Sequence, residues 1–130
     1  MAHPNEELAR QAYTAMTTGD VPWLEAHTHP NVKFFQGGRF PTAGSYEGRD
    51  ALFGHFMEFM TLVDGNFSLD LHDVLVSDDH VVALLNVTIA KGGKELTFAE
   101  VHVWHVKDGL MTEMWAIPQD PYPIDEFLGP

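Results

Sequence analysis

Four strand-like segments follow one another in the second half of the chain, and this order restricts the possible folds more than any other feature. They span residues 66–77, 80–90, 94–106 and 110–118. The first alternates apolar and polar residues, as a strand does when one of its faces is buried. The second is apolar on both faces, which predicts an internal place in a sheet, and Gly92-Gly93 is typical of a hairpin turn. The segments therefore predict an antiparallel meander of four strands.

Three helical patterns precede the meander. They cover residues 5–18, a short stretch from Asp20 to Pro30, and residues 49–63. In the first and third, apolar residues recur at helical spacing, and Asp20 can cap the second. A short strand at 32–36 and a glycine-rich loop at 37–48 separate the last two helices. The proline-containing tail after residue 118 is not expected to form a central strand.

Helices followed by strands predict an α+β fold, with three N-terminal helices packed on one face of a curved, mainly antiparallel sheet. The length fits a single domain over residues 1–130. A strongly curved sheet leaves a hollow between itself and its helices, and such hollows are common sites for small molecules.

The charge balance restricts the partners. A net charge of -12 disfavours binding to nucleic acid and to anionic membrane surfaces. The chain has no cysteine, no signal-peptide pattern and no apolar run of about 18 residues, so we expect a cytoplasmic protein. Motifs for metals, nucleotides and serine hydrolases do not occur in the sequence, so neither a metal nor a cofactor is expected.

One strand carries the best candidates for chemistry. Alternation along 94–106 places Glu100, His102 and Trp104 on one face and His105 on the other. Glu100 and His102 are about 6.6 Å apart along the strand, so their side chains can meet directly or through a water. A carboxylate beside an imidazole is suited to general acid–base chemistry. The alternative is a partly exposed pair near the edge of the sheet.

The turn after this strand decides which side chains of the last strand join that face. A two-residue Asp108-Gly109 turn would place Trp115 opposite His102. A three-residue turn with Gly109 left-handed and a bulge would place Met114 there instead. We favour the second arrangement because it groups Glu113 and Trp115 with His105 on the other face. That face would then form a polar and aromatic patch suited to a dimer interface.

Several segments together resemble the SnoaL-like branch of the nuclear transport factor 2-like superfamily, which includes ketosteroid isomerases, limonene epoxide hydrolases and polyketide cyclases. The segments are AYTAMTTGDVPWL, GRFPTAGSYEGRDAL, DVLVSDDHVVAL, and VKDGLMTEMW followed by DPYPIDEFL. The resemblance covers nearly the whole chain. It implies a cone-shaped α+β barrel with a deep pocket, and a homodimer built on the outer face of the sheet.

The resemblance also bears on individual residues. His102 resembles, by position, the acid that hydrogen-bonds the steroid oxygen in the isomerases. The isomerases' catalytic carboxylate corresponds to Phe35, which cannot take a proton. The Arg–Asp constellation of the epoxide hydrolases is not found. Asp120 is the nearest match to an aspartate that the cyclases use near the end of the last strand, although it is also typical of a turn residue.

Three hypotheses for the function follow. The first is a cofactor-independent enzyme that moves a proton beside the carbonyl of a small, mostly apolar substrate, with His102 and Glu100 as the acid–base pair. The second is a binding module that holds an apolar ligand without catalysis, and a third reading is a dimeric interaction domain whose barrel is filled. The expected pocket is lined by Tyr13, Phe34 or Phe35, Phe53, Phe56, Met57, Trp104 and Met114. His55 is expected to serve packing.

Overall fold

The computed structural model describes residues 2–129, which form four helices and six strands. In chain order the elements are α1 (Pro4–Thr18), α2 (Val21–His27), β1 (Thr28–Gln36), β2 (Gly44–Glu47), α3 (Arg49–Leu62), β3 (Phe67–Val76), β4 (His80–Lys91), β5 (Lys94–Lys107), β6 (Leu110–Pro118) and α4 (Tyr122–Leu128). The three helices and the four-strand meander expected from the sequence are all present.

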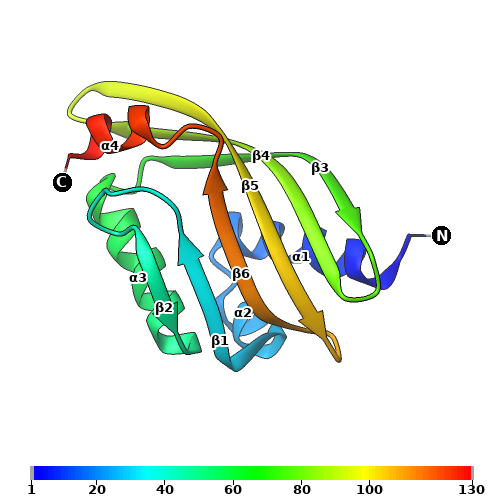
Figure 1. The fold of residues 1–130 in the computed structure, drawn as a ribbon. Coiled ribbons are helices and arrows are strands. Elements are labelled where there is room, and N and C mark those ends of the chain that lie inside the picture. Colours follow the sequence, from blue (N-terminus) through cyan, green and yellow to red (C-terminus); the bar gives the residue numbers. More distant parts are fainter. Residues whose placement is uncertain (1, 130) are drawn as a thin grey trace.

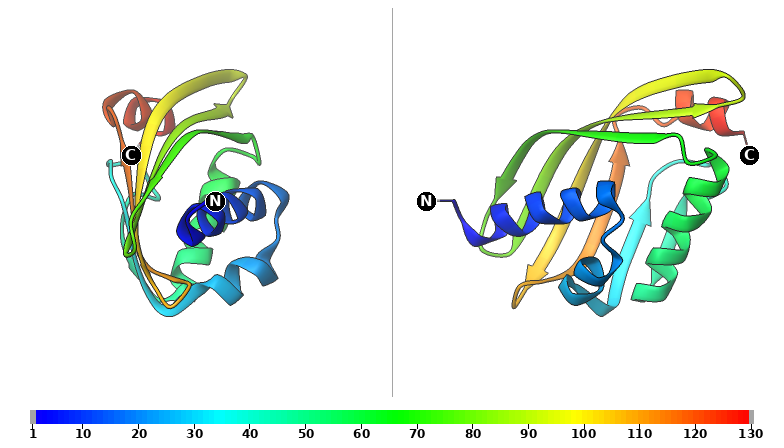
Figure 2. Two further views of the ribbon diagram at one scale, coloured as in Figure 1. Left: turned by 90° about the vertical axis from the view of Figure 1, so that its right-hand side faces the viewer. Right: turned by 180° about the vertical axis from the view of Figure 1, so that it is seen from behind.

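The strands form one curved sheet in the order β2-β1-β6-β5-β4-β3 (Figure 1). All neighbouring pairs are antiparallel except β1 and β6, which run parallel. Helices α1, α2 and α3 lie together on the concave side of the sheet (Figure 2). The expected α+β fold, with helices on one face of a mainly antiparallel sheet, is therefore confirmed.

The core lies between the concave face and these helices. In β4 the buried residues alternate with less buried ones, as one face of a strand requires. They are Val81, Ala83, Leu85, Val87 and Ile89. Ala9, Ala12 and Tyr13 of α1 belong to the same buried cluster. The strand is internal, as its apolar sequence predicts.

Three local features differ from the sequence prediction. The loop predicted at 37–48 contains the short strand β2, which pairs with β1. Strand β1 begins at Thr28, four residues earlier than predicted. The tail contains helix α4, whose residues Ile124 and Leu128 are buried. Proline is tolerated in the first turn of a helix, so the prolines of the tail are compatible with α4.

The turn between β5 and β6 also differs. Lys107 pairs with Leu110, so the turn has two residues, Asp108 and Gly109, both with positive φ (52° and 74°). The predicted three-residue turn is therefore wrong. The extra residue is instead inside β6, because the register shifts between the pairs Val106–Met111 and His105–Glu113.

Candidate functional site

The bulge in β6 decides which side chains reach the interior. Because Thr112 is the residue absorbed by the bulge, Met114 lies beside Trp104, and Ala116 lies beside His102. Both Met114 and Ala116 are buried. Met114 was predicted to lie opposite His102, but it lies two residues further along β5, opposite Trp104. The division between the two faces of the sheet is nevertheless the one expected from the sequence.

Four interior side chains form a continuous chain of hydrogen bonds. Trp104 Nε1 donates to the hydroxyl oxygen of Tyr13 over 3.1 Å. The Tyr13 hydroxyl lies 2.7 Å from His102 Nδ1, and His102 Nε2 lies 2.7 Å from Glu100 Oε1. We call these four residues the Trp104–Glu100 relay. Tyr13 was expected to shape a pocket, and its hydrogen bond to His102 was not predicted.

The relay has a defined hydrogen-bond direction. The indole N–H of Trp104 is a donor only, so the Tyr13 oxygen accepts from it. The Tyr13 proton is then directed to His102 Nδ1, which accepts it as an unprotonated nitrogen. His102 therefore carries its proton on Nε2 and donates it to Glu100. The N–H of Trp104, the O–H of Tyr13 and the Nε2–H of His102 are therefore all donated within the relay.

Burial controls the electrostatics of the relay. The exposed fraction is 2% for Trp104, 3% for Tyr13, 6% for His102 and 8% for Glu100. Burial raises the pKa of the Tyr13 phenol, with a further rise from the negative charge of Glu100, and the bond from Trp104 acts in the opposite direction. Tyr13 is therefore held in its protonated form and serves as a hydrogen-bond donor.

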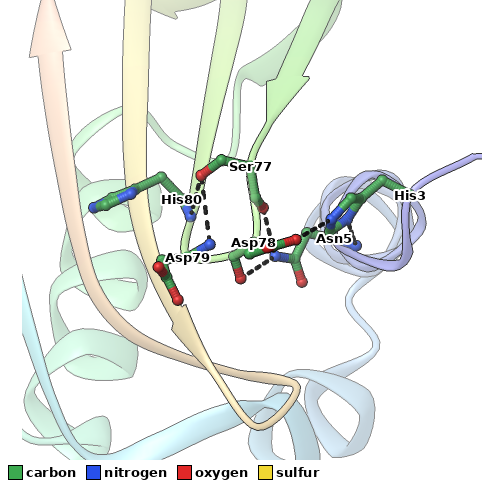
Figure 3. Close-up of polar contacts among 6 residues, drawn as sticks. All are labelled: His3, Asn5, Ser77, Asp78, Asp79 and His80. Atoms are coloured by element: carbon green, nitrogen blue, oxygen red, sulfur yellow. Dashed lines mark hydrogen bonds and ion pairs between the residues drawn. The ribbon is translucent and has the colours of Figure 1, made fainter.

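Helix α1 brings Tyr13 to the sheet, and contacts at its N-terminus fix how it lies. Asn5 Nδ2 donates to the carbonyls of Ser77 and Asp78 over 2.9 and 3.0 Å, at the turn between β3 and β4 (Figure 3). His3 Nε2 lies 3.0 Å from Asp78 Oδ1, and His3 Nδ1 accepts from the backbone N–H of Asn5. These bonds tie the start of α1 to the strand layer, and Tyr13 follows about two turns later.

The structure brings only some of the expected pocket residues inward. Phe34 is buried with the interior core, whereas its neighbour Phe35 is 44% exposed on the opposite face of β1. Met57 is 66% exposed on α3. Phe53 and Phe56 are half-buried, and Phe56 lies near Phe67 of β3. Consecutive residues of a strand point to opposite faces, so Phe34 and Phe35 cannot both line one interior.

Asp120 lies outside the interior. It is exposed, and its Oδ1 accepts from the backbone N–H of Tyr122 over 3.1 Å, where α4 begins. The structure therefore does not bring Asp120 together with the Trp104–Glu100 relay.

Polar residues that the sequence did not mark as site residues also face the core. His55 of α3 is 8% exposed, and its Nε2 has no hydrogen-bond partner among residues 2–129; the same holds for Oγ1 of Thr42, which is 3% exposed. Gln36 is 8% exposed at the end of β1, beside Ala116. Sequence periodicity favoured packing for His55, because its neighbours on α3 are apolar.

Residues 2–129 border at least two hollows, and neither of these two is lined by Glu100 or His102. One, of about 10 Å³, lies among α1, α2 and the inner sheet and includes Trp104 and Met111. The other, of about 520 Å³, is at the surface between the loop after β1 and α4, and includes Arg39 and Tyr122. Of the Trp104–Glu100 relay, Trp104 therefore borders the small hollow, whereas Tyr13, His102 and Glu100 are buried away from both hollows.

Two further observations concern the described part of the chain. Within residues 2–129, no group of three or more His, Asp or Glu side chains is placed to hold a metal ion. None of the helices in that range is long and apolar enough to span a membrane.

Comparison with known proteins identifies relatives that match nearly the whole chain. An uncharacterized protein of Mycobacterium tuberculosis is 27% identical over 122 residues, which cover 93% of each chain. The solved structure of Bal32a, from a soil-derived mobile gene cassette, is 31% identical with a TM-score of 0.91 and 97% coverage of both chains. A solved structure from Jannaschia, described as a putative SnoaL-like polyketide cyclase, is 15% identical with a TM-score of 0.74. The match covers 98% of this chain and 93% of that one, and it shows that the two proteins share a fold.

The family comparison covers most of the fold. The family described as the SnoaL-like domain matches residues 9–114, a range that extends from α1 to Met114 of β6 and includes Tyr13, Glu100, His102 and Trp104. The chain therefore belongs to the SnoaL-like domain family.

Proposed function

We propose that this SnoaL-like domain catalyses a cofactor-independent proton transfer beside the carbonyl group of a small, mostly apolar molecule, as an isomerase or cyclase does. The observation that carries the proposal is the buried Trp104–Glu100 relay. An interior that needed only to be filled would be served better by apolar side chains, because burying a charged carboxylate is costly unless it is compensated. Ionisable groups that are buried and hydrogen-bonded to one another are typical of catalytic sites.

The relay assigns separate tasks to its members. His102 holds Oε1 of Glu100 through its Nε2–H, and the second carboxylate oxygen is the atom available to take a proton from carbon. Tyr13 and Trp104 fix the His102 tautomer from the other side. After an enolate forms, the same pair returns the proton to another atom of the substrate. The proton that is removed is also the proton that is returned, so this reaction needs no cofactor.

The test is hydrogen–deuterium exchange at the carbon beside the carbonyl, followed by NMR with a panel of apolar ketones in D₂O. We expect exchange with a subset of the panel. Glu100→Gln should slow it by about a hundredfold or more, since general acid–base catalysis contributes on that order. Glu113→Gln is the matched control, because Glu113 lies 3.8 Å from His105 in an equivalent Glu–His pair on the opposite face.

A second candidate function is ligand binding without catalysis. It is favoured by one observation, which is that both ring nitrogens of His102 already have partners. In that case the ketones would bind and quench the fluorescence of Trp104, with no exchange at any carbon. Exchange that persists unchanged in Glu100→Gln would also contradict the catalytic proposal.

We further infer that two copies of the chain associate through the outer face of the sheet. Phe35, Trp115 and Ile117 are 44%, 39% and 42% exposed there, and Phe35 lies beside Trp115 across the β1–β6 pair. Trp115 Nε1 donates to Glu113 Oε2 over 2.7 Å, so this aromatic group is already oriented. Exposed apolar residues gathered on one face are typical of a protein interface.

A further inference from the structure

The larger of the two hollows lies outside the core, between helix α4 and the loop that joins β1 to β2 (Figure 1). Its volume of about 520 Å³ is typical of a site for a small molecule. Both Arg39 of the loop and Tyr122 of α4 are exposed there. The lining residues are Gly38, Arg39, Pro121, Tyr122, Asp125 and Gly129. A molecule from the solvent can therefore reach this hollow without any movement of the core.

Contacts between the loop and α4 fix the shape of the hollow. Asp125 Oδ1 accepts from the backbone N–H of Arg39 over 2.7 Å. Gly38 has a φ of 128°, and a Cβ atom at this position would lie 2.6 Å from the ring of the buried Phe40. On the other side, Ile124 anchors α4 in the core cluster. Because both walls are held in place before a ligand arrives, binding does not require them to become ordered.

The guanidinium group in the hollow is available to a ligand. Among residues 2–129, the Arg39 side chain forms neither an ion pair nor a hydrogen bond, whereas Arg10 lies 3.6 Å from Glu6 and Arg49 donates to the Glu25 carbonyl over 3.0 Å. The carboxylate among the lining residues already accepts from the backbone of the loop. A guanidinium presents its N–H groups in the geometry that binds both oxygens of a carboxylate.

Tyr122 supplies an apolar surface in the same hollow. It is 79% exposed, and Pro121 precedes it in the wall formed by the start of α4. An aromatic ring favours a flat, apolar partner, so the hollow combines a site for an anion with a site for a ring. Asp125 also lines the hollow, and its charge repels a dianion such as phosphate more strongly than a monoanion. The hollow therefore favours a carboxylate carried on an aromatic body.

We propose that this Arg39–Tyr122 hollow is a binding site for a small aromatic carboxylate. Arg39 binds the carboxylate, and the ring of Tyr122 packs against the aromatic body. The site is separate from the Trp104–Glu100 relay and does not depend on the proposed function. Helix α4 follows residues 9–114, the range that matches the SnoaL-like family, so one wall of the hollow is built by a segment outside that match.

Titration with 2-naphthoate, followed by NMR of the amide and indole N–H groups, tests the proposal. NMR locates the ligand as well as measuring its affinity, so binding in the hollow is distinguished from binding near Trp104. The uncharged 2-naphthamide has the same shape and controls for the charge of the ligand. Arg39→Gln removes the guanidinium. Arg10→Gln is the matched control, because it removes the same group from an exposed position on α1.

We expect 2-naphthoate to shift the amide signals of Gly38, Arg39 and Gly129 and to leave the indole signal of Trp104 unchanged. Arg39→Gln should bind it at least tenfold more weakly, the loss expected for a charge-assisted hydrogen bond, and Arg10→Gln should bind it like the wild type. Equal affinities in the two variants would overturn the site. Signal changes confined to Trp104 and its neighbours, or equal binding of 2-naphthamide and 2-naphthoate, would overturn it as well.

The aromatic part of the proposal has its own test. Tyr122→Ser removes the ring, and we expect it to weaken the binding of 2-naphthoate by roughly threefold to tenfold, the range for the loss of one aromatic contact. Inorganic phosphate should displace 2-naphthoate only at a much higher concentration than benzoate does. Unchanged affinity in Tyr122→Ser, or displacement by phosphate and benzoate at equal concentrations, would show a general anion site and overturn the assignment. The exchange test of the proposed function is independent of all these results.

Discussion

At the scale of single residues, the candidate site depends on Tyr13, because it joins two groups that cannot bond to each other. The indole of Trp104 can only donate, and Nδ1 of His102 accepts in the tautomer that also reaches Glu100. A hydroxyl that accepts from one and donates to the other satisfies both. Alternation along β5 predicted that Glu100, His102 and Trp104 share a face. It could not predict Tyr13, because the contact spans 89 residues of sequence.

Replacing Tyr13 by Phe should therefore leave two buried polar atoms without partners. Each such atom costs on the order of 1–3 kcal/mol, so we expect Tyr13→Phe to lower the free energy of unfolding by roughly 2–6 kcal/mol, as measured by urea denaturation. The control is Tyr122→Phe, because Tyr122 is 79% exposed and should change stability little. Equal stability of the two variants would contradict the geometry of the relay.

His55 makes a pH-dependent contribution to stability. Its pKa falls from 6.5 to about 4 on folding, mainly through burial. Between these values the unfolded chain binds more protons than the folded one, so stability is greatest above pH 6.5 and falls as the pH approaches 4. The full loss is about 3 kcal/mol. Urea denaturation over this range should show a shallower pH dependence in His55→Phe, and parallel curves would contradict the assignment.

At the scale of elements, the β5–β6 hairpin shows what alternation predicts and what it misses. The two faces of β6 were predicted correctly, although the turn was predicted with the wrong length. An added residue in the turn and an added residue in the strand have the same effect on which faces the later residues occupy. Sequence alone cannot distinguish them. The Thr112 hydroxyl, which donates to the His105 carbonyl over 3.1 Å, helps to fix the bulge in the strand.

The tail and the loop after β1 were missed for a different reason. Helix α4 has seven residues and β2 has four, so neither gives enough periods for a reliable pattern. Their formation depends on tertiary contacts. Asp125 of α4, for example, accepts from the backbone N–H of Arg39 over 2.7 Å, across 86 residues of sequence.

The observed turn gives a direct prediction for Asp108. Its φ of 52° lies in the left-handed region, which β-branched residues occupy only at a cost of about 1–2 kcal/mol. Asp108→Val should lower the free energy of unfolding by that amount, whereas Asp108→Gly should be neutral or slightly stabilising. Thermal unfolding of the two variants checks this. An Asp108→Val variant as stable as Asp108→Gly would indicate the three-residue turn.

At the scale of the whole molecule, the sheet separates two environments. The helices cover its concave face (Figure 2). The Trp104–Glu100 relay is buried on that face, and the outer face carries exposed aromatic and apolar residues. The net charge of -12 opposes association of two copies, so an interface has to be apolar enough to exceed this repulsion. Added salt should therefore strengthen the dimer that we propose.

Trp115→Glu tests that dimer by placing a further negative charge at the centre of the outer face. We expect analytical ultracentrifugation to show a dimer for the wild type and a monomer for the variant. Val21→Glu is the control, because Val21 is 48% exposed on α2, on the other side of the sheet. A wild-type chain that sediments as a monomer at all concentrations would contradict the interface.

The bulge at Thr112 has a consequence for changes in chain length. If Glu113 were lost, every later side chain of β6 would exchange faces, and Trp115 would enter the core while Met114 would leave it. Loss of Thr112 itself would do the opposite, because the pairs Val106–Met111 and His105–Glu113 would then be consecutive in a regular ladder. Thr112 is thus the position in this strand where a deletion is compatible with the fold. Relatives of this chain that differ in length by one residue in β6 should differ at this point.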